Sequence, residues 1–160
     1  MIDAMDRAAG LSPDDPVYKA RRFRPEFVEG AEICRLSVLT PKDGLGLSAP
    51  LRLALARRMA KLNADEVLVS DYETQLAALS PSDELVSLSQ GATKLAEPLA
   101  TIARHADLIT LSPIKAAAGD ITRLQEVGLD NPQIVALSEL IAFVNFQTRV
   151  ATGLRLMGLA

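Results

Sequence analysis

The sequence holds very few of the side chains that build disulfides, metal centres and redox sites. It has one cysteine, Cys34, and one histidine, His105, in 160 residues. A lone thiol cannot close an internal disulfide. One thiol with one imidazole cannot complete a zinc site of four thiolates, or of two thiolates and two imidazoles. We therefore expect no metal and no cofactor.

Long runs of like charge are also missing. No run of Lys and Arg is longer than two residues, and the net charge is −3, which gives little attraction to a nucleic-acid backbone. The N-terminal segment lacks the basic and apolar regions of a secretory signal. The most apolar stretch, residues 137–159, contains charged side chains and is expected to be a buried helix rather than a membrane span. We expect a cytoplasmic protein without nucleic-acid or membrane partners.

Aromatic residues are scarce, with four Phe, two Tyr and no Trp, whereas Ala and Leu are abundant. This composition favours close-packed helices over sheets. Good N-cap residues also stand directly before prolines that suit a first helical turn. The helix starts predicted in this way are Ser12-Pro13, Ser80-Pro81, Ser112-Pro113 and Asn131-Pro132, and Ser80 with Asp83 resembles a capping box.

The spacing of apolar residues predicts the body of each helix. The expected helices cover residues 26–39, 51–63, 65–79, 83–90, 96–109, 119–127 and 132–157. In the first of these the apolar face is Phe27, Ala31, Cys34 and Val38, and in the second Arg52, Arg57, Arg58 and Lys61 lie away from the apolar stripe. The last helix is apolar on two sides, as expected for a helix between neighbours. The prediction is an all-α bundle with a long C-terminal helix.

The C-terminal third carries a recognisable pattern. A Pro is followed seven residues later by an Asp that opens a helix, then by a Leu, a Gly and a long helix with Asn and Arg one turn apart. These residues are Pro113, Asp120, Leu124, Gly128, Asn145 and Arg149. The pattern resembles the carboxymuconolactone-decarboxylase/AhpD-like superfamily, specifically its alkylhydroperoxidase-related branch, and residues 51–76 resemble the family's other signature region.

The resemblance implies an AhpD-like helical bundle formed by residues 1–160 as one domain. It also implies a homo-oligomer, as a dimer, trimer or hexamer. We expect the N-terminal extension, residues 1–24, to pack on a neighbouring subunit.

Family members that act as peroxidases carry a Cys-x-x-Cys-x-x-x-His motif, in which one thiolate attacks the peroxide and the second resolves the sulfenic acid. On this sequence the two Cys positions fall on Asp65 and Leu68, and the His position falls on Tyr72. The family's upstream Glu falls on Leu53. A dithiol mechanism is therefore impossible within this chain.

Three residues remain as candidates for chemistry. A phenol at Tyr72 would suit a ligand hydrogen bond, although a ring that packs and points its hydroxyl outward is the simpler interpretation. His105 follows Arg104 late in a helix, where a surface or capping role is favoured. Cys34 is interpreted as a small buried hydrophobe rather than a peroxidatic thiol.

Asn145 and Arg149 are four residues apart on an otherwise apolar helix and therefore share a face. A structural role is favoured, with Arg149 pairing an acidic residue such as Glu139 of a neighbour or capping helix carbonyls. The alternative is a ligand-binding pair, because a planar guanidinium is well suited to a carboxylate.

Three hypotheses follow for the function. The first is an AhpD-like protein without the dithiol site, acting as a non-catalytic subunit, as a companion of a Cys-containing AhpD-like relative, or as a small-molecule binder. The second is a decarboxylase-type enzyme that acts on a small acidic substrate with Tyr72, His105 or Arg149. The third is a peroxidase that borrows thiols from a partner chain.

Overall fold

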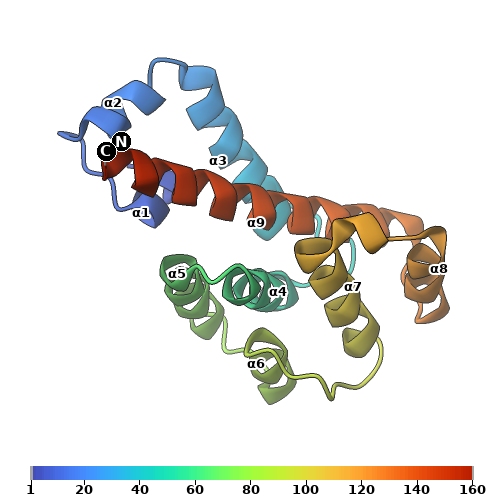
Figure 1. The fold of residues 1–160 in the computed structure, drawn as a ribbon. Coiled ribbons are helices and arrows are strands. Elements are labelled where there is room, and N and C mark those ends of the chain that lie inside the picture. The colour runs from blue at the N-terminus through green and yellow to red at the C-terminus, as the bar shows by residue number, and fades with distance from the viewer. Residues whose placement is uncertain (1, 160) are drawn as a thin grey trace.

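The computed structural model describes residues 2–159 and contains helices but no strands over that range, which confirms the predicted all-α class (Figure 1). The elements, in chain order, are α1 (Ala4–Ala9), α2 (Pro16–Arg21), α3 (Pro25–Leu39), α4 (Ala49–Leu62), α5 (Glu66–Ala77), α6 (Asp83–Ser89), α7 (Leu99–Leu111), the 3₁₀ helix η1 (Pro113–Lys115), α8 (Ala118–Glu126) and α9 (Asn131–Gly158). The bodies of the predicted helices agree with α3 to α9.

The long helix α9 is the element around which the others are arranged. It crosses the whole molecule (Figure 1), and α1, α2, α3, α4, α7 and α8 all pack against it. Its buried residues extend from Ile134 to Ala151 and lie on more than one side. The predicted position between neighbours is therefore confirmed. By length and composition α9 would suffice to cross a membrane, but 61% of its most apolar window is buried inside the molecule.

Helix α4 is surrounded on all sides. Every residue from Leu51 to Ala60 is buried, including Arg52, Arg57 and Arg58. These arginines lie off the apolar stripe, as the spacing predicts, but they are buried as well because α5, α6, α7 and α9 all pack on this helix.

The buried arginines Arg52 and Arg58 link α4 to neighbouring elements by hydrogen bonds. Arg52 donates three hydrogen bonds to carbonyls at the end of α3 and in the loop before α4. Arg58 donates to both carboxylate oxygens of Asp107 on α7, at 2.7 and 2.6 Å, and to two carbonyls at the end of α6. Each guanidinium thus satisfies carbonyls that would otherwise be buried without partners.

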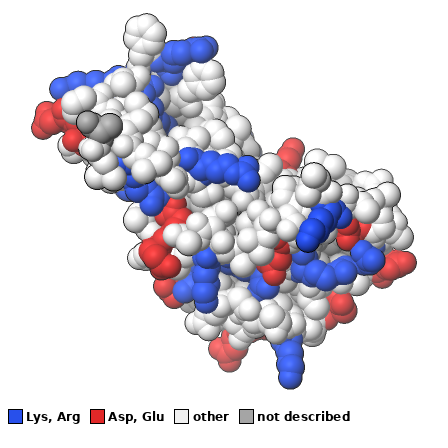
Figure 2. All heavy atoms as spheres, viewed as in Figure 1, with Lys and Arg blue, Asp and Glu red and all other residues white. Residues whose placement is uncertain are grey.

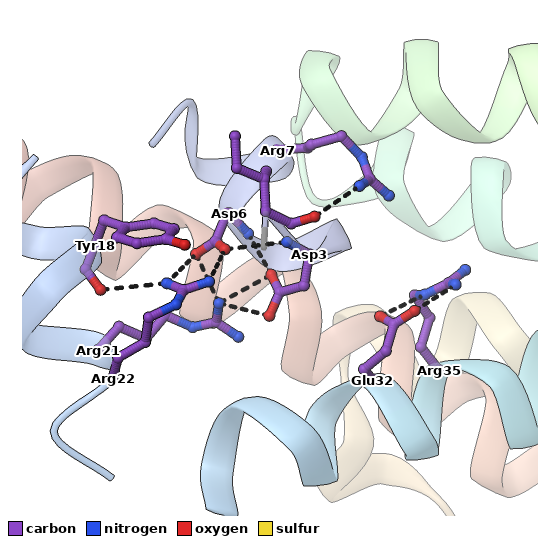
Figure 3. A network of polar contacts seen from close by, with 9 residues as sticks. Asp3, Asp6, Arg7, Tyr18, Arg21, Arg22, Glu32 and Arg35 are labelled. Atoms are coloured by element: carbon purple, nitrogen blue, oxygen red, sulfur yellow. Dashed lines mark hydrogen bonds and ion pairs between the residues drawn. The ribbon is translucent and has the colours of Figure 1, made fainter. Parts of the chain in front are cut away.

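The first two helices are joined by a cluster of charged side chains (Figure 3). Asp6 on α1 has a fully buried side chain, and its carboxylate pairs with Arg21 and Arg22 of α2 at 2.7 and 2.6 Å. Burial alone would raise the pKa of Asp6. The hydrogen bonds from Arg22, from the Asp3 amide and from Arg21 outweigh it, and they lower the pKa below its ordinary value. The cluster holds α2 onto α1, and both helices pack on α9 of the same chain. Packing of residues 1–24 on a neighbouring subunit stays a prediction.

Two predicted helix starts are displaced. Ser80 has a left-handed backbone, with φ +48°, which does not suit an N-cap. Ser82 caps α6 instead, so the predicted Ser80–Asp83 capping box is wrong. Ser12 starts no helix, because α2 begins at Pro16 behind Asp15.

The other two starts lie close to their predicted places. Ser112-Pro113 opens the short η1 rather than an α-helix. Helix α9 is capped by Asp130, one residue before the predicted Asn131. The Asp130 carboxylate accepts the Gln133 amide, and the Gln133 side chain accepts the Asp130 amide. This is a complete capping box.

The surface mixes both signs of charge. Over the face drawn in Figure 2, acidic and basic side chains are interspersed, and neither sign dominates.

Helix α3 differs from the other long helices because most of its predicted apolar face is not buried. Of its predicted apolar face only Val38 is buried, and Phe27 is 61% exposed. Only the C-terminal end of α3 is therefore buried.

Candidate functional site

The candidate site, called the main cavity, is an open hollow of about 600 Å³ bordered by α7, η1, the start of α8 and the middle of α9. Its walls are mostly Ala, Ile and Pro side chains. The polar residues among them include His105, Asp120, Asn145 and Arg149. Three of the candidates from the sequence, His105, Asn145 and Arg149, are thus brought together, although they lie on two different helices.

His105 is buried in this wall, with a relative exposure of 6%. The predicted surface or capping role is therefore wrong. It failed because α8 and the 3₁₀ turn before it fold back over the helix that carries His105. The Nδ1 atom has no hydrogen-bond partner. Burial lowers the pKa of His105, and the nearby Asp120 partly opposes the shift. The imidazole is accordingly neutral near pH 7, and its Nδ1 atom is buried without a partner among residues 2–159.

Asp120 belongs to the first turn of α8. Its carboxylate accepts the Ala117 amide at 2.9 Å and pairs with Arg123 at 2.7 Å. The hydrogen bond from the Ala117 amide is the main cause that lowers the pKa of Asp120. Asp120 therefore brings a fixed negative charge to the wall beside His105.

Asn145 is a structural bridge rather than a free ligand group. Its amide nitrogen donates to Thr110 Oγ1 at 3.2 Å and to the Ile141 carbonyl at 2.9 Å, and its amide oxygen accepts from Asn63 at 3.1 Å. These bonds join α4, α7 and α9. The structural role favoured from sequence is supported by this full set of partners.

Arg149 lies one turn further along α9 and is exposed at the cavity. Its side chain forms no hydrogen bond or ion pair with any other residue in the range 2–159, and pairing with Glu139 of a neighbour stays a prediction. Its guanidinium is thus an unneutralised cation beside an apolar hollow, which is the arrangement that receives an organic anion.

The residues at the family's thiol positions lie elsewhere and have structural roles. Asp65 caps α5 by accepting the Leu68 amide at 3.1 Å, and its other oxygen pairs with Arg155 of α9. Leu68 is buried in the core. None of the three motif positions borders the main cavity.

Tyr72, at the His position, has a relative exposure of 1%, and its hydroxyl donates to Gln147 on α9. Burial raises the pKa of Tyr72. The predicted outward-pointing hydroxyl is wrong, because α9 lies over the ring and supplies the hydrogen-bond acceptor.

The position of Cys34 also contradicts the sequence prediction. The thiol is exposed on α3, which does not border the main cavity. The apolar spacing around it was real, but no element of the described chain covers that face. Within residues 2–159 no group of His, Cys, Asp and Glu side chains is arranged to hold a metal ion.

A second hollow adjoins the first and was missed from the sequence. It has a volume of about 410 Å³ and includes Arg104, Lys115 and Arg123, which come from α7, η1 and α8. No short motif joins these three cations in the sequence. The helical spacing of Asp120 and Arg123, three residues apart, was the only available signal.

Comparisons with known proteins support the fold. No family model matches the sequence, and no curated protein matches it. Among solved structures, the chain is similar to the crystal structure of an uncharacterized peroxidase-related protein from Silicibacter sp. TM1040. The TM-score is 0.72 at 18% identity, and the match covers 95% of this chain and 79% of that chain. At this identity the likeness shows the fold alone, and the chain therefore shares the helical fold of a peroxidase-related protein.

Proposed function

We propose that this chain is an AhpD-like protein of the alkylhydroperoxidase-related branch that has no thiol peroxidase site and binds a small organic acid. The similarity to a peroxidase-related protein supports the superfamily. The observation that carries the proposal is the unpaired Arg149 at the edge of an apolar cavity of about 600 Å³. The ligand class is an apolar acid whose carboxylate pairs with the Arg149 guanidinium.

The three motif positions support the loss of peroxidase chemistry. Asp65 and Tyr72 are held by partners on α9, and Leu68 is core. The remaining thiol, Cys34, is exposed on α3, and no second cysteine exists to resolve a sulfenic acid. We further propose that the protein is a cytoplasmic homo-oligomer, and that it binds a Cys-containing relative rather than reducing peroxide alone.

The first experiment measures peroxide consumption by the purified protein with a dithiol reductant. We expect none above background, and Cys34→Ser is expected to behave as the unmodified protein does. Turnover that disappears in Cys34→Ser would contradict the proposal.

The second experiment measures binding of benzoate, with benzyl alcohol as the uncharged comparison. In Arg149→Gln the affinity for benzoate is expected to fall about tenfold, since a charge-assisted hydrogen bond is lost. The affinity for benzyl alcohol is expected to stay the same. Arg7→Gln on α1 is the matched control. Equal benzoate binding by Arg149→Gln and the unmodified protein would reject the assigned role of Arg149.

A decarboxylase-type enzyme is the second candidate, and one observation favours it. His105 lines the same cavity as Arg149, and burial lowers the pKa of His105, so an acid held by Arg149 would have a neutral imidazole close by. Tyr72 has no part in this version because it does not border the cavity. The test measures release of CO₂ from small dicarboxylates. Release that is lost in His105→Gln would support the decarboxylase, and no release from the unmodified protein would count against it.

A further inference from the structure

The second hollow carries an inference of its own. It lies between α7, η1 and the first turn of α8, and Figure 2 shows Lys and Arg side chains gathered over this end of the molecule, with acidic ones between them. Arg104 and Lys115 are exposed and form no ion pair with any residue of the described chain. The Arg123 side chain is 52% exposed, and one of its guanidinium nitrogens donates to Asp120.

We propose that this hollow is a binding site for a phosphate dianion, either free or as the head group of a phosphate monoester, held by Arg104, Lys115 and Arg123.

The charge balance of the hollow selects the ligand. Three cations face the single carboxylate of Asp120, and two of these cations have no partner. A monocarboxylate would neutralise only one of them, whereas a phosphate dianion matches both and offers three acceptor oxygens. The hollow also lies at the start of α8, where the helix dipole favours negative charge.

His105 supplies the second, independent observation. It lines this hollow as well as the main cavity, it is more than nine-tenths buried, and its Nδ1 atom has no partner. The charged groups that line the two cavities around it are Arg104 on α7, Lys115 on η1, Asp120 and Arg123 on α8, and Arg149 on α9. An anion among them would offset the cations around the imidazole and so favour its protonated form.

The shape of the two cavities suggests how a monoester would lie. His105, Ala117 and Asp120 border both. A phosphate in the second hollow would therefore leave an attached apolar group at the entrance to the main cavity.

The proposed phosphate site does not depend on the role proposed for Arg149, since Arg149 does not line the second hollow.

The single histidine makes the test direct, because every imidazole NMR signal of the protein comes from His105. We expect the pKa of His105 to be about one pH unit higher in inorganic phosphate than in sodium chloride at equal ionic strength. Phenyl phosphate is expected to do so at a lower concentration than inorganic phosphate does. An equal response to chloride, or none to either phosphate compound, would overturn the proposal.

Paired variants locate the effect. In Arg104→Gln/Lys115→Gln both phosphate responses are expected to disappear, while Arg7→Gln/Lys42→Gln, which removes the same charges at remote exposed positions, is expected to respond as the unmodified protein does. All four side chains are exposed, so the variants should fold, and circular dichroism checks that they do. A response that survives in Arg104→Gln/Lys115→Gln would place the anion elsewhere and reject the site. If benzoate binding fails its own test but the phosphate response holds, only the function proposed for Arg149 is lost.

Discussion

At the scale of single residues, this chain uses buried polar side chains to join its helices. Tyr72 shows how. Its ring is part of the core, and its hydroxyl donates to Gln147, which is itself only 2% exposed. A buried donor and a buried acceptor satisfy each other across α5 and α9, so both must be kept or both lost.

Tyr72→Phe should lower the free energy of unfolding by about 1–2 kcal/mol, because the Gln147 oxygen would stay buried without its donor. Urea unfolding followed by circular dichroism measures the change. Tyr72→Phe/Gln147→Leu removes both polar groups and should recover part of the loss. A single variant as stable as the unmodified protein would mean that the Gln147 oxygen does not depend on this donor.

Sequence reasoning was weakest for individual burial. It identified the residues of interest, His105, Asn145 and Arg149, but it misjudged the burial of Cys34 and of His105. Cys34 was expected inside and is outside, and His105 was expected at the surface and is inside. Apolar spacing defines a face of a helix, and it does not say whether another element covers that face.

At the scale of helices, the contact between α5 and α9 depends on Asp65. One carboxylate oxygen caps α5, and the other pairs with Arg155 in the last turns of α9. Asp65 therefore both starts α5 and pairs with the long helix α9. A cysteine there would supply neither the cap nor the charge.

Asp65→Ala should lower the free energy of unfolding by about 1–3 kcal/mol, through loss of the cap and of the ion pair. Ser82→Ala removes only a cap, that of α6, and should cost less. Asp65→Asn keeps a capping oxygen and should lie between the unmodified protein and Asp65→Ala. Thermal unfolding ranks the variants, and equal effects of Asp65→Ala and Ser82→Ala would exclude a contribution from Arg155.

Helix bodies were the most predictable part of the fold, because each carries several turns of apolar spacing. Helix starts were less predictable. Ser80 has the right side chain for a cap but the wrong backbone angles, and the competing Ser82 and Asp130 were close enough in sequence to replace the expected caps. The hydrogen bonds of Arg52 and Arg58 could not be predicted, since their partners include carbonyls at the ends of α3 and α6, distant in the sequence.

At the scale of the whole molecule, the N-terminal helices are held by charge as well as by apolar packing. The Asp6 carboxylate, fully buried against Arg21 and Arg22, has a lowered pKa in the folded protein. Its stabilising effect is therefore complete above the ordinary pKa of an aspartate, about 3.9. It is lost as the pH falls further, because the unfolded chain binds the proton more readily than the folded one.

Asp6→Asn should accordingly be less stable than the unmodified protein at neutral pH, and the difference should shrink as the pH falls below about 4. Denaturant unfolding over a pH series measures it. Asp14→Asn, at an exposed position, should show no such gap. A gap between Asp6→Asn and the unmodified protein that is the same at every pH would show that charge on Asp6 contributes nothing to it.

The central place of α9 has a consequence for how the protein is made. Residues 131–158 are synthesised after every helix that they cover, and six of those helices need them as a packing partner. During translation the apolar sides of the earlier helices therefore stay open to water and to other nascent chains. Such intermediates aggregate readily, so we expect this polypeptide to need shielding on the ribosome until residues 131–158 have emerged.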